Sequence, residues 1–342
     1  MRQLLLSTWN QRGALAFFLW PVSLLYGALT EMRRYLYRRE IFTVHRVSVP
    51  VIVVGNVVVG GAGKTPVVMA LLQHFQSRGV MAGVVSRGYG RQGKDCREVF
   101  ADSVPSDAGD EPILIKRITG APVFVAPARI DAARALLTAH PDVEVVICDD
   151  GLQHFGLHRD IDICVFDERG TGNGFFLPAG PLRERWPRPT DLVLAPESLR
   201  LAEGFHLWRD LADEAQRADG TRVALQDLRG SQQRDGTPLW AVAGIAQPEI
   251  FFAMLRARGL QLARAEALPD HAEFAGSEWI NAGAHTLLCT EKDAVKLWRY
   301  RPDALAVPLA LKIDSAFWKA LDSLLTVAKS AKLSSKHGLS TS

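Results

Sequence analysis

The hydrophobic positions change their period several times between residues 49 and 167, and each change predicts a new element. VPVIVVGN (49–56) is a continuous apolar, β-branched run, typical of a strand buried on both faces. PVVMALLQHFQSRG (66–79) carries apolar residues at helical spacing and stops at a glycine. The alternation continues with strands at 80–90, 121–127, 143–151 and 160–167 and helices at 109–120 and 129–141. Strands that alternate with helices predict an α/β fold with a doubly wound, mainly parallel sheet.

A polar, turn-rich stretch, DLRGSQQRDGTP, interrupts this pattern and reads as a domain boundary. After it come a strand at 239–246, a helix at 248–259, and a strand followed by a loop at 285–297. The last residues are polar and low in complexity, which is typical of disorder. The expected organisation is an N-terminal region at 1–42, a phosphate-loop core at 43–226, a linker at 227–238, a smaller α/β domain at 239–327 and a disordered tail at 328–342.

The N-terminal region contains an uncharged stretch, residues 13–30, followed at once by the basic segment EMRRYLYRRE. A cleaved signal peptide is disfavoured because Tyr26 would occupy the −3 position of the cleavage site. A spanning helix is at the lower limit of length and contains Pro21, and a buried core helix is a further alternative. We favour a helix lying in a membrane surface, with its arginines facing anionic lipid: Arg33, Arg34, Arg38 and Arg39.

Composition narrows the class of protein. With 342 residues, 48% hydrophobic and 23% charged, the chain is that of a folded protein with a sizeable core. A net charge of +3 is too small to indicate a nucleic-acid partner. The four cysteines form no C-x-x-C pair, so we expect reduced thiols in a cytosolic protein.

The turn between the first strand and helix is rich in glycine and ends in Gly63-Lys64-Thr65, as a phosphate-binding loop does. Backbone N–H groups at the helix start would wrap the phosphates of ATP, Lys64 would reach the β and γ oxygens, and Thr65 would ligate Mg²⁺. Val58 stands where the usual motif has its first glycine. The expected nucleotide-binding residues are Val58, Val59, Gly60, Gly61, Ala62, Gly63, Lys64 and Thr65.

Carboxylates follow at strand and helix ends. Asp149 and Asp150 sit at a strand tip, where one could hold Mg²⁺ and the other bond Thr65 or the loop. Asp110 opens a helix, so it is either a helix cap or the base that accepts the proton of a hydroxyl nucleophile. His271 could steer that carboxylate, although spacing alone does not pair the two.

Two arginines are candidate clamps for a transferring phosphoryl group. Arg129 follows a predicted strand, and Arg183 lies in the tight segment LPAGPLRE together with Glu184. A guanidinium fork can meet two phosphoryl oxygens at once. The alternative for each arginine is an ordinary surface ion pair.

Taken together, these blocks resemble the tetraacyldisaccharide 4′-kinase family, the lipid A 4′-kinases of Gram-negative bacteria. The resemblance spans about residues 49–296, and the family's own loop lacks the same first glycine. It rests on VPVIVVGNVVVGGAGKTP, VVSRGYGR, GDEP, ICDDGLQH, FLPAGPLRE, GIAQPEIFF, LPDHAEF and TEKDAVK in this order.

The resemblance implies transfer of the ATP γ-phosphate to the 4′-hydroxyl of tetraacyldisaccharide 1-phosphate, giving lipid IVA. It further implies work at the cytoplasmic face of the inner membrane, a membrane-contacting N-terminal helix, and two α/β/α units joined by a two-stranded linker. By matching motifs, Lys64 and Thr65 take phosphate and Mg²⁺ roles. Asp110 becomes a base paired with His271. The residues implied around nucleotide and metal are Asp149, Asp150, Arg129, Arg183 and Glu184, and those near the sugar phosphate are Ser86, Arg87 and Tyr89.

Two other functions use the same loop. A ParA/MinD-like switch hydrolyses ATP to control membrane attachment, but those ATPases carry a lysine where this chain has Val59. An adaptor that binds nucleotide only for its shape would have no need of the acids at 110, 149 and 150.

Overall fold

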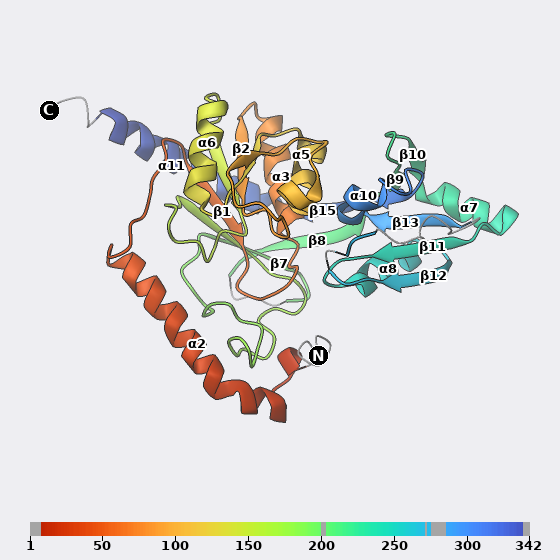
Figure 1. The fold of residues 1–342 in the computed structure, drawn as a ribbon, viewed down its shortest axis with the longest axis horizontal. Coiled ribbons are helices and arrows are strands. Elements are labelled where there is room, and N and C mark those ends of the chain that lie inside the picture. The colour runs from red at the N-terminus through yellow and green to blue at the C-terminus, as the bar shows by residue number, and fades with distance from the viewer. Residues whose placement is uncertain (1–7, 200–202, 271, 275–284, 338–342) are drawn as a thin grey trace.

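The protein, described here as a computed structural model over residues 8–199, 203–270, 272–274 and 285–337, consists of two α/β units (Figure 1). We call them the large unit, built on a nine-stranded sheet, and the small unit, residues 214–307, built on a six-stranded sheet. A long helix, α2, lies along one side of the large unit (Figure 1).

The sheet of the large unit has the strand order β15-β8-β7-β6-β1-β5-β2-β4-β3. All neighbours from β8 to β4 are parallel, and only the two edge strands run antiparallel. The doubly wound, mainly parallel sheet is therefore confirmed. Its strands are β1 (Val51–Gly55), β2 (Ala82–Ser86), β3 (Arg97–Glu98), β4 (Val123–Val125), β5 (Val145–Asp149), β6 (Ile161–Val165), β7 (Leu192–Pro196), β8 (Phe205–Leu211) and β15 (Leu309–Ile313).

Helices cover both faces of this sheet, which explains why its central strands are apolar on both sides. One face packs against helices that bury side chains such as Leu71, Ile113 and Phe317. The other face packs against a helix that buries Leu136. The helices of this unit are α3 (Lys64–Ser77), α4 (Pro105–Ala108), α5 (Asp110–Thr119), α6 (Arg129–Ala139) and α11 (Ser315–His337).

The small unit has the strand order β10-β9-β14-β13-β11-β12 and its own two cores. Leu228 and Phe252 anchor two helices on one face, and Leu297 anchors a helix on the other. Its elements are β9 (Glu214–Gln216), β10 (Arg222–Ala224), α7 (Leu225–Asp235), β11 (Leu239–Ala243), α8 (Pro248–Ala257), β12 (Leu262–Ala267), β13 (Thr286–Thr290), α10 (Glu291–Leu297) and β14 (Leu305–Val307).

The predicted domain boundary at 227–238 is wrong, because the segment up to Asp235 is part of α7 and belongs to the small unit. Leu225 and Leu228, three positions apart, bury one face of α7, while its polar residues face solvent. The chain crosses between units earlier, between β8 and β9, and returns between β14 and β15. Since β8 and β15 pair with each other, they form the two-stranded connection that the resemblance implies.

The C-terminal expectations also need correction. The predicted small domain does not continue to residue 327, because β15 and α11 return to the large unit. The predicted disordered tail begins inside α11, which stays helical to His337. Leu325 and Ala328 are buried on its inner face, so packing of an amphipathic stripe outweighs the polar composition. Residues 338–342 lie outside the described part. The predicted loop after β13 is the helix α10.

Helix α2 (Ala14–Arg38) is the one helix in the described residues that is long and apolar enough to cross a bilayer, with a mean hydropathy of 1.4 over its best window. Its buried residues are small, Ala16, Ser23 and Gly27. Phe17 and Trp20 also contact the ring of Phe175, and the hydroxyl of Tyr26 donates to the carbonyl oxygen of Arg183 at 3.3 Å. A side chain at Gly27 would collide with the ring of Phe176, so glycine permits this close approach. Most of its large apolar side chains are exposed, including Phe18 at 79%.

Candidate active site

The first half of the phosphate loop is extended and paired with the segment that follows Phe176. Val58 forms an isolated antiparallel bridge with Leu182. The backbone N–H of Val59 donates to the carbonyl oxygen of Pro181 at 2.9 Å. A residue in extended pairing has no need of glycine's freedom. This explains why the motif's first glycine can be a valine here.

The second half of the loop does require glycine. Gly60 has φ 103° and Gly63 has φ 73°, both in the region that side chains disfavour. Gly63 is the residue before α3, so Lys64 and Thr65 are the first two residues of that helix. Their backbone N–H groups have no partner within the helix, as an anion site requires.

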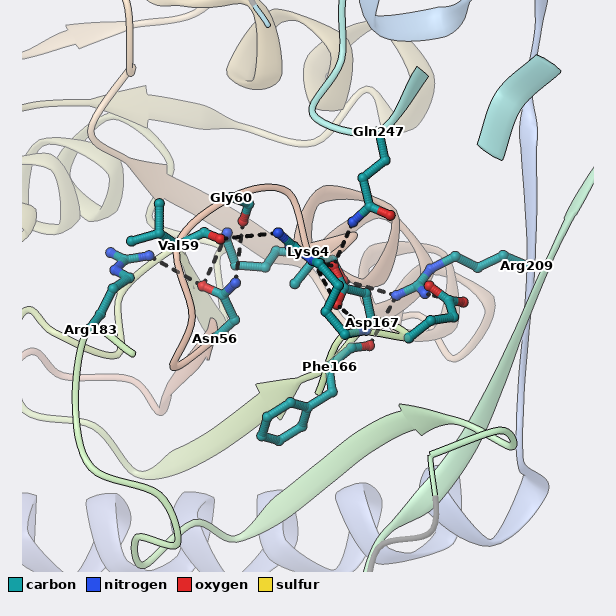
Figure 2. A network of polar contacts seen from close by, with 12 residues as sticks. Asn56, Val59, Gly60, Lys64, Phe166, Asp167, Arg183, Arg209 and Gln247 are labelled. Carbon is teal, nitrogen blue, oxygen red and sulfur yellow. Dashed lines mark hydrogen bonds and ion pairs between the residues drawn. The ribbon is translucent and has the colours of Figure 1, made fainter. Parts of the chain in front are cut away.

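Lys64 and Arg183, which lie 119 positions apart, meet at the amide of Asn56 (Figure 2) and at the carboxylate of Asp150. Lys64 Nζ is 3.6 Å from Asp150 Oδ1 and 3.4 Å from Asn56 Oδ1. Arg183 Nη1 donates to the same two oxygens, at 3.1 and 3.2 Å. Burial opposes ionisation of Asp150, yet these two cations hold its pKa below the ordinary value. The cluster places two cations beside the phosphate loop.

Asp149 fits a magnesium site. It ends β5, is buried, and its Oδ1 has no hydrogen-bond partner among the described residues. Burial raises its pKa to about 7, and the nearby acids Glu111 and Asp150 add to that rise. A divalent cation would relieve this repulsion. The described part of the chain holds no cluster of three or more acidic, histidine or cysteine ligands. Mg²⁺ is commonly bound by one or two protein carboxylates together with phosphates, and Asp149, close enough to Lys64 for the two charges to interact, can supply one of them.

Glu184 is buried behind this cluster, and the structure differs here from a simple metal-ligand role. One of its oxygens accepts from Gln153 Nε2 at 2.5 Å, and the other pairs with Arg188 at 2.9 Å. Gln153 also donates to the carbonyl oxygen of Asn56 at 2.9 Å. Both carboxylate oxygens of Glu184 thus have protein partners, and through Gln153 they are linked to the backbone of Asn56. Direct ligation of a metal would require an exchange of these partners.

Arg129 is the first residue of α6 and is buried. It lies close enough to lower the pKa of both Asp149 and Asp150. Its Nη1 donates to the carbonyl oxygen of Ala126 at 3.4 Å, and its Nε is one of the buried nitrogens without a hydrogen-bond partner in the described residues. This guanidinium therefore faces the acidic side of the site.

Asp110 begins α5 at the same edge of the sheet and is 5% exposed. The preceding Gly109 has φ 90°, and a side chain there would strike the backbone of Gly88 and Tyr89. This tight crossing fixes the start of the helix. Because its neighbour Glu111 raises the pKa of Asp149, the two acidic sites are electrostatic neighbours. His271, its expected partner, lies outside the described residues.

Sequence reasoning missed a second cluster, on the other side of the phosphate loop (Figure 2). Asp167 lies two residues past β6 and is held by Arg169 at 2.6 Å. Arg169 Nη1 also donates to the carbonyl oxygen of Val59 at 3.4 Å. Gln247, from the small unit, donates to Asp167 at 3.0 Å. The sequence does show that Asp167 follows β6, a strand that pairs with β1, and this position could have marked it as a site residue. Its partner Gln247 could not be predicted, because it comes from a distant segment of the chain.

Arg209 of β8 supports the same side of the loop. Its Nη2 donates to the carbonyl oxygens of Ala62, at 2.9 Å, and Phe166, at 3.2 Å (Figure 2). A cavity of about 270 Å³ opens beside this cluster, and it is lined from both units by Val58, Arg169, Ala246 and Gln247 among others. The phosphate loop therefore faces a hollow between the units.

The family described as Tetraacyldisaccharide-1-P 4′-kinase matches residues 15–326. A tetraacyldisaccharide 4′-kinase of Acidovorax sp. (strain JS42) is 55% identical over 325 residues, 94% of each chain. A protein of the same name from Polaromonas naphthalenivorans (strain CJ2) is 53% identical over the full length of both chains.

A solved structure agrees with these relatives. The "apo" form of LpxK from Aquifex aeolicus, in complex with ATP, matches with a TM-score of 0.77 and 27% identity. The match covers 91% of this chain and 99% of that one. A family match over most of the chain and relatives above 50% identity agree with the fold and with the phosphate loop. The chain therefore belongs to the tetraacyldisaccharide 4′-kinase family.

Proposed function

We propose that this chain transfers the γ-phosphate of ATP to the 4′-hydroxyl of tetraacyldisaccharide 1-phosphate, forming lipid IVA in lipid A biosynthesis. The observation that carries the proposal is the family match over residues 15–326. The phosphate loop and the carboxylates beside it supply the parts that such a reaction needs.

The residue roles follow from the site. The N–H groups at the start of α3 hold the phosphates, and Lys64 and Arg183 stabilise the charge that develops on the transferring group. Asp149, Asp150 and Thr65 offer the oxygen ligands for Mg²⁺, which when bound neutralises phosphate charge. Arg129 is a further cation close to these acids. Glu184 supports the site by accepting a hydrogen bond from Gln153.

Asp110 is the proposed base. The acceptor oxygen forms a bond to the γ-phosphorus while the bond from that phosphorus to the β–γ bridging oxygen breaks, and ADP leaves. Asp110 takes the proton of the acceptor hydroxyl as this happens. A buried carboxylate at the start of α5, beside the metal-side acids, suits that role. Pairing with His271 remains part of the proposal.

We also place the work at the cytoplasmic face of the bacterial inner membrane, with α2 in contact with lipid. Its exposed apolar side chains and the exposed Arg33 and Arg38 support contact with an anionic surface. Arg34, also expected to face lipid, does not: its side chain is 12% exposed and lies 3.9 Å from Glu31. The acceptor is an amphiphile held in the bilayer by acyl chains. A kinase that carries its own membrane-contacting helix can reach the headgroup without extracting the lipid.

The direct test incubates the purified protein with Mg-ATP and tetraacyldisaccharide 1-phosphate and determines the product mass. We expect an increase of one phosphate. An acceptor whose 4′-hydroxyl is replaced by hydrogen serves as the control and should gain none. Unchanged mass of the natural acceptor would contradict the proposal.

A further inference from the structure

The small unit reaches the proposed base through a lysine that sequence reasoning did not single out. Lys296 lies in α10, and its Nζ is 3.0 Å from Asp110 Oδ2. The two side chains are 8% and 6% exposed. They belong to different units, α10 to the small one and α5 to the large one. This is the most deeply buried charge pair that crosses between the units among the described residues.

Further contacts fix Lys296 in this position. Its Nζ lies 3.1 Å from Glu273 Oε1 and donates to the carbonyl oxygen of Ala272 at 3.4 Å. Because Glu273 is 77% exposed on its side chain, solvent screens that pair far more than the one with Asp110. Of these two carboxylates, Asp110 is therefore the less screened counter-charge of Lys296.

Helix α10 is hydrogen-bonded to the loop after β11, a segment of the small unit that lies near the phosphate loop. Asp293, buried in its first turn, accepts from the backbone N–H of Gly244 at 3.0 Å. Gly244 follows β11, and the next residues of that loop reach the large unit. Ala246 packs near Gly61, and Gln247 donates to Asp167. Helix α10 and the loop after β11, joined by this hydrogen bond, therefore contact both the proposed base and the phosphate-loop region.

A second lysine of α10 docks beside the first. Lys292 Nζ lies 3.3 Å from Glu111 of the large unit and 3.3 Å from Asp270 of the small unit. The spacing of four residues places both lysines on one face of the helix. That face meets the two acids at the start of α5, which explains why α10 and α5 are adjacent.

We propose that Lys296 is a positioning residue: by pairing with Asp110 across the two units, it orients the carboxylate that receives the acceptor proton. The small unit then completes the active site. The inference rests on the proposed function. A buried carboxylate free to rotate would present its lone pairs to the acceptor only part of the time, whereas a charge-assisted contact at Oδ2 holds the carboxylate in one orientation.

The test compares kcat for phosphoryl transfer to tetraacyldisaccharide 1-phosphate in the wild type, Lys296→Met, Lys296→Arg, Asp110→Asn and the Lys296→Met/Asp110→Asn double variant. We expect Lys296→Met to lower kcat about 10- to 100-fold, the range found when a group that orients a metal ligand is removed. The KM for ATP should stay within about twofold, because the nucleotide contacts are elsewhere. Lys296→Arg should keep part of the activity.

The double variant separates positioning from mere docking. If Lys296 acts through Asp110, the double variant is no slower than Asp110→Asn alone. Lys329→Met removes a surface lysine that pairs with Glu144 at 2.7 Å, and it should retain wild-type kcat. Thermal unfolding and nucleotide binding are measured for every variant. If Lys296→Met does not fold, the test depends on Lys296→Arg. A kcat below that of the wild type, at wild-type thermal stability, then supports the inference.

Three results would overturn the inference: wild-type kcat in Lys296→Met, wild-type kcat in a folded Lys296→Arg when the methionine variant does not fold, or losses that multiply in the double variant. The wild-type protein in the same assay tests the proposed function separately. Transfer by the wild type with no effect at Lys296 removes only the inference. No transfer by the wild type removes the function on which it rests.

Discussion

At the level of single residues, the site is organised around carboxylates whose charge is controlled by their neighbours. Asp150 is kept ionised by Lys64 and Arg183, while burial raises the pKa of Asp149 to about 7. The pKa values of these two adjacent aspartates are thus shifted in opposite directions. Groups whose pKa values are strongly shifted by burial and by specific charged partners are typical of functional sites.

The sequence was sufficient to predict part of this site. Lys64 and Asp150 follow strands that pair in the sheet, so their meeting could be expected from topology. Arg183 was expected near them and contacts Asp150. Asn56, Asp167 and Lys296 were not predicted, because their importance depends on partners brought together by tertiary packing and no short spacing records it.

Lys64→Ala and Asp110→Asn test the two central roles. Loss of the Lys64 ammonium removes charge stabilisation of the transferring phosphoryl group, and we expect kcat to fall by about 10²–10³-fold. Loss of the base should cost about 10²–10⁴-fold. Steady-state kinetics with the acceptor lipid measure both effects, and thermal unfolding checks that each variant is folded. Near-normal kcat in Asp110→Asn would remove the base assignment while leaving the kinase function in place.

At the level of elements, a few buried apolar residues determine whether a segment is helical more strongly than its overall polar composition does. α7 and the end of α11 are polar in sequence, yet each buries a narrow apolar stripe, Leu225 with Leu228 and Leu325 with Ala328. The central strands were predictable because they are apolar on both faces. The helical structure of α7 and of the end of α11 was not predictable, because an apolar stripe of two or three residues is hard to recognise before the surface that it packs against is known.

The C-terminal helix gives a stability prediction. Leu325 is 6% exposed in the core of the large unit, whereas Val327 on the same helix is 69% exposed. Leu325→Ala should lower the free energy of unfolding by about 2–5 kcal/mol. Val327→Ala is the control and should change it by less than about 0.5 kcal/mol. Chemical denaturation measures both, and equal values would mean that the helix does not pack as described.

Helix α2 gives a membrane prediction. Phe18 and Leu25 are 79% and 62% exposed, so their replacement by glutamate removes apolar surface without disturbing the buried small residues of the helix. We expect the Phe18→Glu/Leu25→Glu variant to bind vesicles containing anionic phospholipid at least about tenfold more weakly. Sedimentation with vesicles measures the bound fraction, and Val327→Glu, a change at another exposed apolar position, is the matched control. Undiminished binding of the double variant would show that another surface contacts the membrane.

At the level of the whole molecule, the active site is shared between two units. The large unit supplies the phosphate loop and the acids, and the small unit adds Gln247 at one end and Lys296 at the other. The α/β class and the existence of two sheets followed from the alternation of strands and helices. The return of the chain through β15 could not be predicted in this way, because the pairing of β15 with β8 joins segments about 100 residues apart.

The central claim is that the γ-phosphate leaves ATP for a glycolipid hydroxyl and not for water. The measurement is a balance of label: Mg-ATP labelled in the γ position is incubated with the protein and vesicles containing tetraacyldisaccharide 1-phosphate, and the label is counted in lipid and in inorganic phosphate. The account predicts that nearly all label lost from ATP appears in the lipid, and that omitting the acceptor nearly stops ATP consumption. Label that appears only as inorganic phosphate, at a rate indifferent to the acceptor, would contradict it and favour an ATPase switch.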